Sequence, residues 1–254
     1  MLKRALLVSS LWSLAALAAA PDEAACKKGN ASACAKAGRA RIDSEEYALA
    51  KPLLEKGCQH GSAESCDDLG WIYDDGLGVD IDKKKAAESY AKSCAGGFAR
   101  GCTNEGVMHL KGEGFAKDPK KAGDCFQKAC DGKNNPGCRD LAFRFLNGDG
   151  REKDLDKAFD LFSESCGKTD STAGASCYDV AVMYLNGEGR EKDLPNAKTF
   201  FEKACNMDYG AGCYDLGVMY ANGEGMPANK VLAKKSYKKG CDLGHQKSCE
   251  HAGK

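Results

Sequence analysis

The chain of 254 residues contains 15 cysteines, and their number and regular spacing suggest a chemical role. Cysteine thiols bind zinc, act as nucleophiles or join in disulfides. Structural zinc sites place their cysteines about two to four residues apart, whereas here six pairs are eight residues apart and one pair is eleven apart. The spacing favours disulfides, and we expect no metal site and no cofactor.

Each cysteine pair needs a turn between its members. Eight residues of continuous helix rise about 12 Å, and the Cα atoms of a disulfide lie within about 7 Å of each other. Glycine or asparagine provides turn residues at Gly61, Gly96-Gly97, Asn134-Asn135, Gly210 and Gly244. The predicted bridges are Cys26–Cys34, Cys58–Cys66, Cys94–Cys102, Cys130–Cys138, Cys166–Cys177, Cys205–Cys213 and Cys241–Cys249.

Cys125 has no partner in this scheme. Its counterparts in the other copies of the repeat described below are apolar residues or serine. A half-buried, inert thiol is the simplest interpretation, while an intermolecular bridge or a reactive thiol is the alternative.

A repeat of about 36 residues must position these pairs. Cys58, Cys94, Cys130, Cys166, Cys205 and Cys241 recur at intervals of 36, 36, 36, 39 and 36. Within each interval a Gly-x-Gly pair is followed by Asp or Asn four residues later and by Ala after four more. The chain is therefore predicted to be an array of similar units.

Each unit is predicted to be a helical hairpin. Cys213, Leu216, Gly217 and Tyr220 share one face of a first helix, which the following glycines can end in the left-handed conformation. The residues four positions after the Gly-x-Gly pairs are predicted N-caps of a second helix; they are Asp82, Asp118, Asp154, Asp193 and Asn229. The inward face of that second helix is predicted to include Ala197, Phe200, Phe201 and Ala204. The predicted boundaries are an abbreviated cap at 26–61, repeats at 62–97, 98–133, 134–172, 173–208 and 209–244, and a C-terminal cap at 245–254.

The first residues have the composition of a secretory signal peptide. Lys3 and Arg4 precede an apolar run that ends in small residues, and this run is shorter than the about 20 residues of a membrane-spanning helix. We expect a signal peptide over 1–18, a linker over 19–25 and no membrane span. Export to the periplasm or the medium would place the cysteines in an oxidising compartment.

Charge argues against a nucleic-acid partner. The chain has 37 Lys and Arg against 37 Asp and Glu, so no basic excess is present to neutralise phosphates.

The repeat resembles the Sel-1-like repeats, which are related to the tetratricopeptide repeat. The resemblance is carried by Leu69-Gly70 with Tyr73, Leu216-Gly217 with Tyr220, the Gly-x-Gly loops and the Asp-x-x-x-Ala of the second helix. The added cysteine pairs make the chain similar to secreted cysteine-rich members of the Hcp type. Leu141-Ala142 and Val180-Ala181 depart from Leu-Gly, but alanine is still small. The resemblance implies an all-α, right-handed superhelical solenoid with a disulfide in each repeat.

The resemblance also implies a monomeric adaptor that holds a protein or peptide, or a cell-wall fragment, on its concave face. In tetratricopeptide-type hairpins the ligand-facing positions lie three before, one after and four to five after the small residue of Leu-Gly. Carried over, they are Asp67, Trp71 and Asp75; Thr103, Val107 and Lys111; Arg139, Phe143 and Asn147; Tyr178, Val182 and Asn186; Tyr214, Val218 and Asn222. We single out Trp71 and the last three repeats, where Arg139, Tyr178 and Tyr214 stand in register with Asn147, Asn186 and Asn222, and where Phe143 adds an apolar contact.

Each of these residues has a simpler alternative. The asparagines are equally explained as residues that end a helix before glycine, and the tyrosines as ordinary packing. If Tyr178 and Tyr214 are anchors, they should point away from the hairpin core.

Members of the Hcp type also carry penicillin-binding or weak β-lactamase assignments, so a hydrolase is the alternative function. Ser89, Ser165 and Ser236 begin S-x-x-K matches, but Lys168-Thr169 is followed by Asp170, so the K-T-G motif of the serine enzymes is missing. The four histidines show no spacing to a nucleophile. We therefore expect no catalytic residue.

Overall fold

The computed structural model describes residues 21–253, so the predicted signal peptide lies outside the described residues. Residues 21–27 are helical, and every regular element after them within the described range is an α-helix. The chain divides after Asn134 into two compact units, named unit 1 and unit 2 here. This confirms the predicted all-α fold built from helical hairpins.

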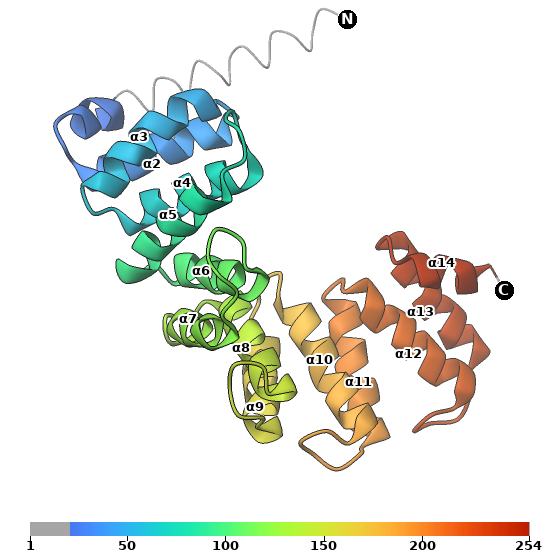
Figure 1. The fold of residues 1–254 in the computed structure, drawn as a ribbon. Helices are drawn as coiled ribbons and strands as arrows, with labels where there is room; N and C mark the ends of the chain where they lie inside the picture. The colour runs from blue at the N-terminus through green and yellow to red at the C-terminus, as the bar shows by residue number, and fades with distance from the viewer. Residues whose placement is uncertain (1–20, 254) are drawn as a thin grey trace, which may run out of the picture. The chain divides into compact units, whose positions relative to one another are not determined.

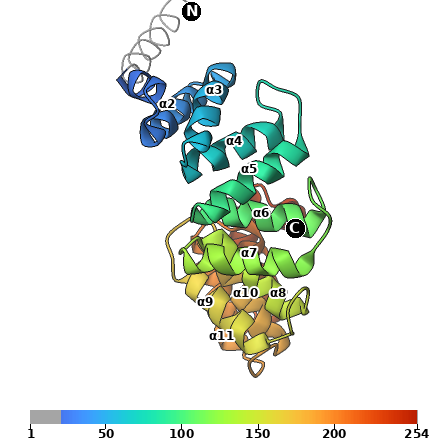
Figure 2. The ribbon, with the colours of Figure 1, turned by 60° about the vertical axis from the view of Figure 1, so that its left-hand side comes forward.

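Unit 1 contains three hairpins (Figures 1 and 2). They are α2 (Ala31–Asp43) with α3 (Tyr47–Gln59), α4 (Ala63–Asp75) with α5 (Lys83–Ala95), and α6 (Ala99–Lys111) with α7 (Pro119–Asp131). The two helices of each hairpin pack together, and the first helices α2, α4 and α6 also contact one another in that order. We call the surface formed by these first helices the first-helix face of unit 1.

Unit 2 repeats the plan (Figure 1). Its hairpins are α8 (Asn135–Asn147) with α9 (Leu155–Cys166), α10 (Ala173–Asn186) with α11 (Leu194–Asn206), and α12 (Gly210–Asn222) with α13 (Lys230–Asp242), followed by the short α14 (Gln246–Ala252). The first helices α10 and α12, and then α12 and α14, contact one another.

Local signals set the ends of the helices, as predicted. The glycine after the first helix adopts the left-handed conformation, with φ of 76° at Gly112 and 75° at Gly187. The side chains of all five predicted N-caps accept a hydrogen bond from the backbone N–H three residues later, at 2.9 to 3.0 Å.

Disulfides lie at the junctions between the second helix of one hairpin and the first helix of the next. Six bridges join the predicted partners with Cα–Cα distances of 4.4 to 4.6 Å, and Cys130 and Cys138 are also disulfide-bonded. These bonds remove the zinc alternative at the paired cysteines.

A left-handed residue lies in the turn of every eight-residue cysteine pair. It stands three positions after the first cysteine and is glycine at Gly61, Gly97 and Gly244. At the same position the chain has Lys133 (φ 62°) and Asp208 (φ 59°); the expected turn residue Asn134 follows Lys133 between α7 and α8, whereas Gly210 is already the first residue of α12. Position in the turn decides this conformation, and the surrounding helices and disulfide hold non-glycine residues in it.

Small residues let the two helices of a hairpin approach closely. A Cβ atom on Gly106 would lie 2.6 Å from the ring of Phe126, and one on Gly217 would lie 2.5 Å from the ring of Tyr237. Ala142 and Ala181, which replace this glycine in two repeats, are fully buried. The predicted inward residues Ala197, Phe201 and Ala204 are buried as well, and Phe200 is partly buried against the core.

Candidate functional site

The first-helix face of unit 1 contains a hollow of about 380 Å³. Its lining comes from α2, α4, α5 and α6 and consists of Arg39, Asp67, Asp68, Trp71, Asp74, Tyr90, Arg100 and Asn104. A second hollow of about 280 Å³ adjoins it, because both are lined by Arg39 and Asp68. The second hollow adds Ala35, Lys36, Ala40, Asp43 and Glu64. We call the two together the α2–α4–α6 groove.

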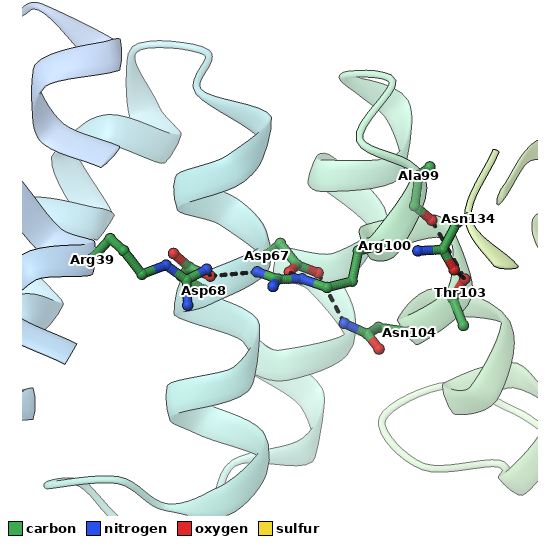
Figure 3. Close-up of polar contacts among 8 residues, drawn as sticks. All are labelled: Arg39, Asp67, Asp68, Ala99, Arg100, Thr103, Asn104 and Asn134. Carbon is green, nitrogen blue, oxygen red and sulfur yellow. Dashed lines mark hydrogen bonds and ion pairs between the residues drawn. The ribbon is translucent and has the colours of Figure 1, made fainter. Parts of the chain in front are cut away.

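Two buried carboxylates form the floor of this groove. Asp67 and Asp68 follow each other on α4 and are only 1% and 2% exposed. Figure 3 shows the side chains of Arg39, Arg100 and Asn104 directed toward them from α2 and α6. Arg100 bonds both aspartates, with its Nη2 2.7 Å from Asp68 Oδ1, and Arg39 donates to the same oxygen. Ion pairs between hairpins therefore hold the floor together.

Burial dominates the electrostatics of Asp68. Loss of solvent raises its pKa to about 6, and the nearby Arg39 and Arg100 offset only part of that effect. The two arginine side chains keep 37% and 45% of their surface exposed. Arginine has five N–H donors, so guanidinium N–H groups that are not used on the aspartates face the solvent in the groove.

Trp71 forms an aromatic wall of the groove in a fixed orientation. Its Nε1 donates to Asp75 Oδ2 at 2.7 Å, and its ring meets the edge of Tyr47 with centroids 6.3 Å apart. Of the carried-over ligand-facing positions, Asp67 and Trp71 line the groove, and Trp71 is the one that we singled out. The sequence reasoning missed Arg39, Asp68 and Arg100. The available signal for a buried ionic site was the adjacent pair Asp67-Asp68 on a helix face that was expected to be buried.

The predicted anchors in unit 2 take part in contacts between successive first helices. Arg139 Nε donates to Asp179 Oδ2 at 2.6 Å, and Tyr178 is hydrogen-bonded to Asp215. The ring of Tyr214 lies 5.5 Å from that of His251. In each contact, the residue three positions before the small residue of one first helix meets the residue two positions before the small residue of the next first helix. Asp67 and Asn104 make the same kind of contact in unit 1. We call these contacts the inter-repeat ladder.

The aromatic anchors also pack on the hairpins. The ring of Tyr178 lies 5.5 Å from Phe201 and 5.3 Å from Tyr209, and that of Tyr214 lies 5.8 Å from Tyr237. The expectation that the two tyrosines point away from the core is wrong, because both are only partly exposed and rest on aromatic neighbours. Phe143 packs edge-on against Phe162 at 5.0 Å. A further role of these residues in binding a partner stays a prediction.

The three asparagines of unit 2 are exposed. Asn147, Asn186 and Asn222 are the last residues of their helices, and the following glycine takes the left-handed conformation. The backbone N–H of Gly187 completes the cap by bonding Met183 O, so the cap does not depend on the Asn186 side chain. The Asn222 amide donates to Glu224 Oε1 at 2.9 Å. These side chains are therefore accessible to a ligand, and the predicted peptide clamp stays a prediction.

The groups considered as nucleophiles are held in helical packing. Ser89 Oγ donates to the backbone carbonyl of Lys85 at 2.7 Å, as serines inside helices commonly do. Cys125 is buried, and burial together with nearby Glu105 raises the pKa of its thiol to about 12. A protonated, buried thiol is a poor nucleophile, which favours the inert alternative for Cys125.

Within residues 21–253 no helix is long and apolar enough to cross a membrane. Over the same residues, no group of three or more His, Cys, Asp or Glu is placed to hold a metal ion.

The chain is similar to solved structures of bacterial proteins. The chain superposes on c5321, a protective antigen present in uropathogenic Escherichia coli strains that displays an SLR fold, with a TM-score of 0.82 and 21% identity over 92% of this chain, which spans 50% of the c5321 chain. A Sel1 repeat protein from Oxalobacter formigenes gives a TM-score of 0.78 and 22% identity, with 86% of each chain covered. Helicobacter pylori cysteine rich protein B is 30% identical over 53% of this chain and 94% of its own, with a TM-score of 0.42.

No curated protein matches the chain significantly. The family model of the Sel1 repeat, in contrast, matches five segments, at residues 63–98, 99–134, 136–170, 174–209 and 210–245. These segments cover most of the chain and coincide with its hairpins. The chain therefore belongs to the Sel1 repeat family.

Proposed function

We propose that the protein is an exported, non-catalytic adaptor that binds an extended peptide segment of a partner protein on the first-helix face of its hairpins. The observation that carries the proposal is the α2–α4–α6 groove. It is preformed, it crosses three successive first helices, and it combines an aromatic wall with outward guanidinium donors. Binding sites of this kind fix an extended backbone through hydrogen bonds and add affinity through aromatic contact area.

The disulfides support export. A disulfide in each repeat indicates an oxidising compartment outside the cytosol. We place the adaptor in the periplasm or the medium, as a monomer, with a cell-wall fragment as the alternative ligand.

The test is capture of partners from the exported fraction on immobilised protein. Three versions are compared, namely the wild type, Trp71→Ala, and the triple variant Asn147→Ala/Asn186→Ala/Asn222→Ala. Loss of a captured partner with Trp71→Ala supports the groove, and loss with the triple variant supports the clamp predicted in unit 2. Thermal unfolding checks that each variant is folded. Capture that is unchanged in both variants would show that neither the α2–α4–α6 groove nor the asparagines of unit 2 form the binding surface.

A further inference from the structure

The α2–α4–α6 groove is locally acidic in a chain that is neutral overall. Five carboxylates line the two hollows, against three basic side chains, whereas the whole chain has 37 of each sign. In the centre, Asp67 and Asp68 are compensated by Arg39 and Arg100. Asp74 is paired with Lys83, which does not line the groove, so the uncompensated carboxylates are Asp43 and Glu64 of the second hollow.

The second hollow contains the carboxylates of Asp43 and Glu64. Both side chains are exposed, and neither forms an ion pair within the described part of the chain. Lys36 is the single basic side chain that the second hollow adds. This hollow has a net negative charge and is accessible to a ligand.

In the first hollow, Trp71 lies beside carboxylates of its own helix. Asp75 is exposed and accepts the indole N–H of Trp71, while Asp74 pairs with Lys83 Nζ at 2.7 Å. An indole ring attracts a cation that lies over its face. The aromatic face and the carboxylate beside it suit a lysine or arginine side chain.

The centre suits a peptide backbone. Arg39 and Arg100 still have solvent-exposed N–H donors after they bond the aspartates, and a ligand can accept from those donors. A ligand carboxylate would accept these bonds but would also be repelled by the carboxylates of both hollows. A backbone carbonyl accepts the same bonds without that repulsion.

We propose that the groove binds an extended peptide segment with basic side chains on both sides of a central stretch, whose backbone carbonyls accept from Arg39 and Arg100. One basic side chain lies against Asp43 and Glu64 in the second hollow, and another lies over Trp71, beside the Asp75 carboxylate that accepts the indole N–H, in the first. This proposal rests on the adaptor function proposed above and specifies the chemistry of its partner.

The test is selection from a random-sequence peptide library on the immobilised protein, in parallel on the wild type and on Asp43→Asn/Glu64→Gln. Both substitutions are at exposed positions and keep the size of the side chain. The matched control, Glu191→Gln/Asp242→Asn, removes two exposed carboxylates from unit 2. We expect the wild type and the control to enrich lysine and arginine over the input library, and the groove variant to lose that enrichment.

Recovered peptides are then titrated by tryptophan fluorescence. The chain has two tryptophans, so Trp12→Phe leaves Trp71 as the only one, and its emission reports occupation of the groove. The groove variant should bind the basic peptides about tenfold more weakly, and the difference should shrink at high salt. Enrichment of aspartate and glutamate, or equal affinity of wild type and groove variant, would overturn the basic partner while leaving peptide binding intact. If no peptide is enriched and none changes Trp71 emission, the groove is not a peptide site and the proposed function fails with it.

Discussion

Asp68 should make the protein more stable in mild acid than at neutral pH. Burial raises its pKa from 3.8 to about 6 in the folded chain. Between these values the folded chain keeps a proton that the unfolded chain has lost, so the free energy of unfolding rises as the pH falls through this window. The contribution is fully present below pH 3.8 and is lost as the pH rises through about 6. A shift of two units corresponds to about 3 kcal/mol, of which about 2 kcal/mol develops between about pH 7.5 and pH 4.5.

Asp68→Asn isolates this contribution. The amide keeps an oxygen that can accept from Arg39 and Arg100, but it does not titrate. Guanidinium unfolding under non-reducing conditions, followed by Trp71 fluorescence, gives the free energy of unfolding of both proteins at each pH. The wild type should gain about 2 kcal/mol relative to Asp68→Asn over this range. Shifts at Asp140, Asp179 and Asp215 cancel in the comparison, since both proteins share them.

The exposed Asp242→Asn is the control for the loss of a surface carboxylate. A flat difference for Asp68→Asn, or a wild type that loses stability relative to it in acid, would refute the reasoning. Either result would mean that the ion pairs with Arg39 and Arg100 outweigh burial and keep the Asp68 carboxylate charged.

Three further predictions concern the scaffold. Replacing both Cys94 and Cys102 by alanine opens a loop with a sequence separation of 8. On the chain-entropy model this should lower the free energy of unfolding by about 2.5 kcal/mol, which denaturant unfolding measures. No loss of stability would mean that the helical packing alone holds the junction. Cys125 should resist iodoacetamide in the folded chain at neutral pH and react after unfolding, because its thiol is buried and its pKa is near 12; rapid labelling of the native protein, read by mass spectrometry, would restore the reactive alternative. Gly70→Ala should destabilise the folded protein by about 1 to 3 kcal/mol despite the better helix propensity of alanine, because the added Cβ would lie 2.6 Å from the Tyr90 ring. The control Gly253→Ala adds its Cβ in open space and should change the melting temperature little.

The hairpins could be predicted from the sequence because their signals are local. The N-cap aspartates and the left-handed glycines act within a few residues of each helix end, and the cysteine spacing requires a turn inside each pair. The same reasoning looked for glycine or asparagine in each turn and did not locate the position that needs a positive φ, which Lys133 and Asp208 occupy at two junctions.

The groove could not be predicted in the same way, because it is assembled from three hairpins. Asp68 receives Arg39 from 29 residues before it and Arg100 from 32 residues after it, and only the packing of α2, α4 and α6 brings them together. The sequence placed Asp67 and Trp71 at ligand-facing positions. It did not show that neighbouring first helices bury Asp67 and leave Trp71 as the wall of a hollow.

The inter-repeat ladder changes how the predicted anchors of unit 2 should be tested. The carried-over position three before the small residue is occupied by Arg139, Tyr178 and Tyr214, and each of these side chains contacts the next first helix. Truncating Tyr178 or Tyr214 therefore removes packing between hairpins as well as any contact with a partner, and we expect both substitutions to lower stability. The position four to five after the small residue does not have this double role, because Asn147, Asn186 and Asn222 are exposed at the ends of their helices. Loss of binding at unchanged stability in the asparagine variants would assign a binding surface to unit 2, whereas the tyrosine variants cannot separate the two effects on their own.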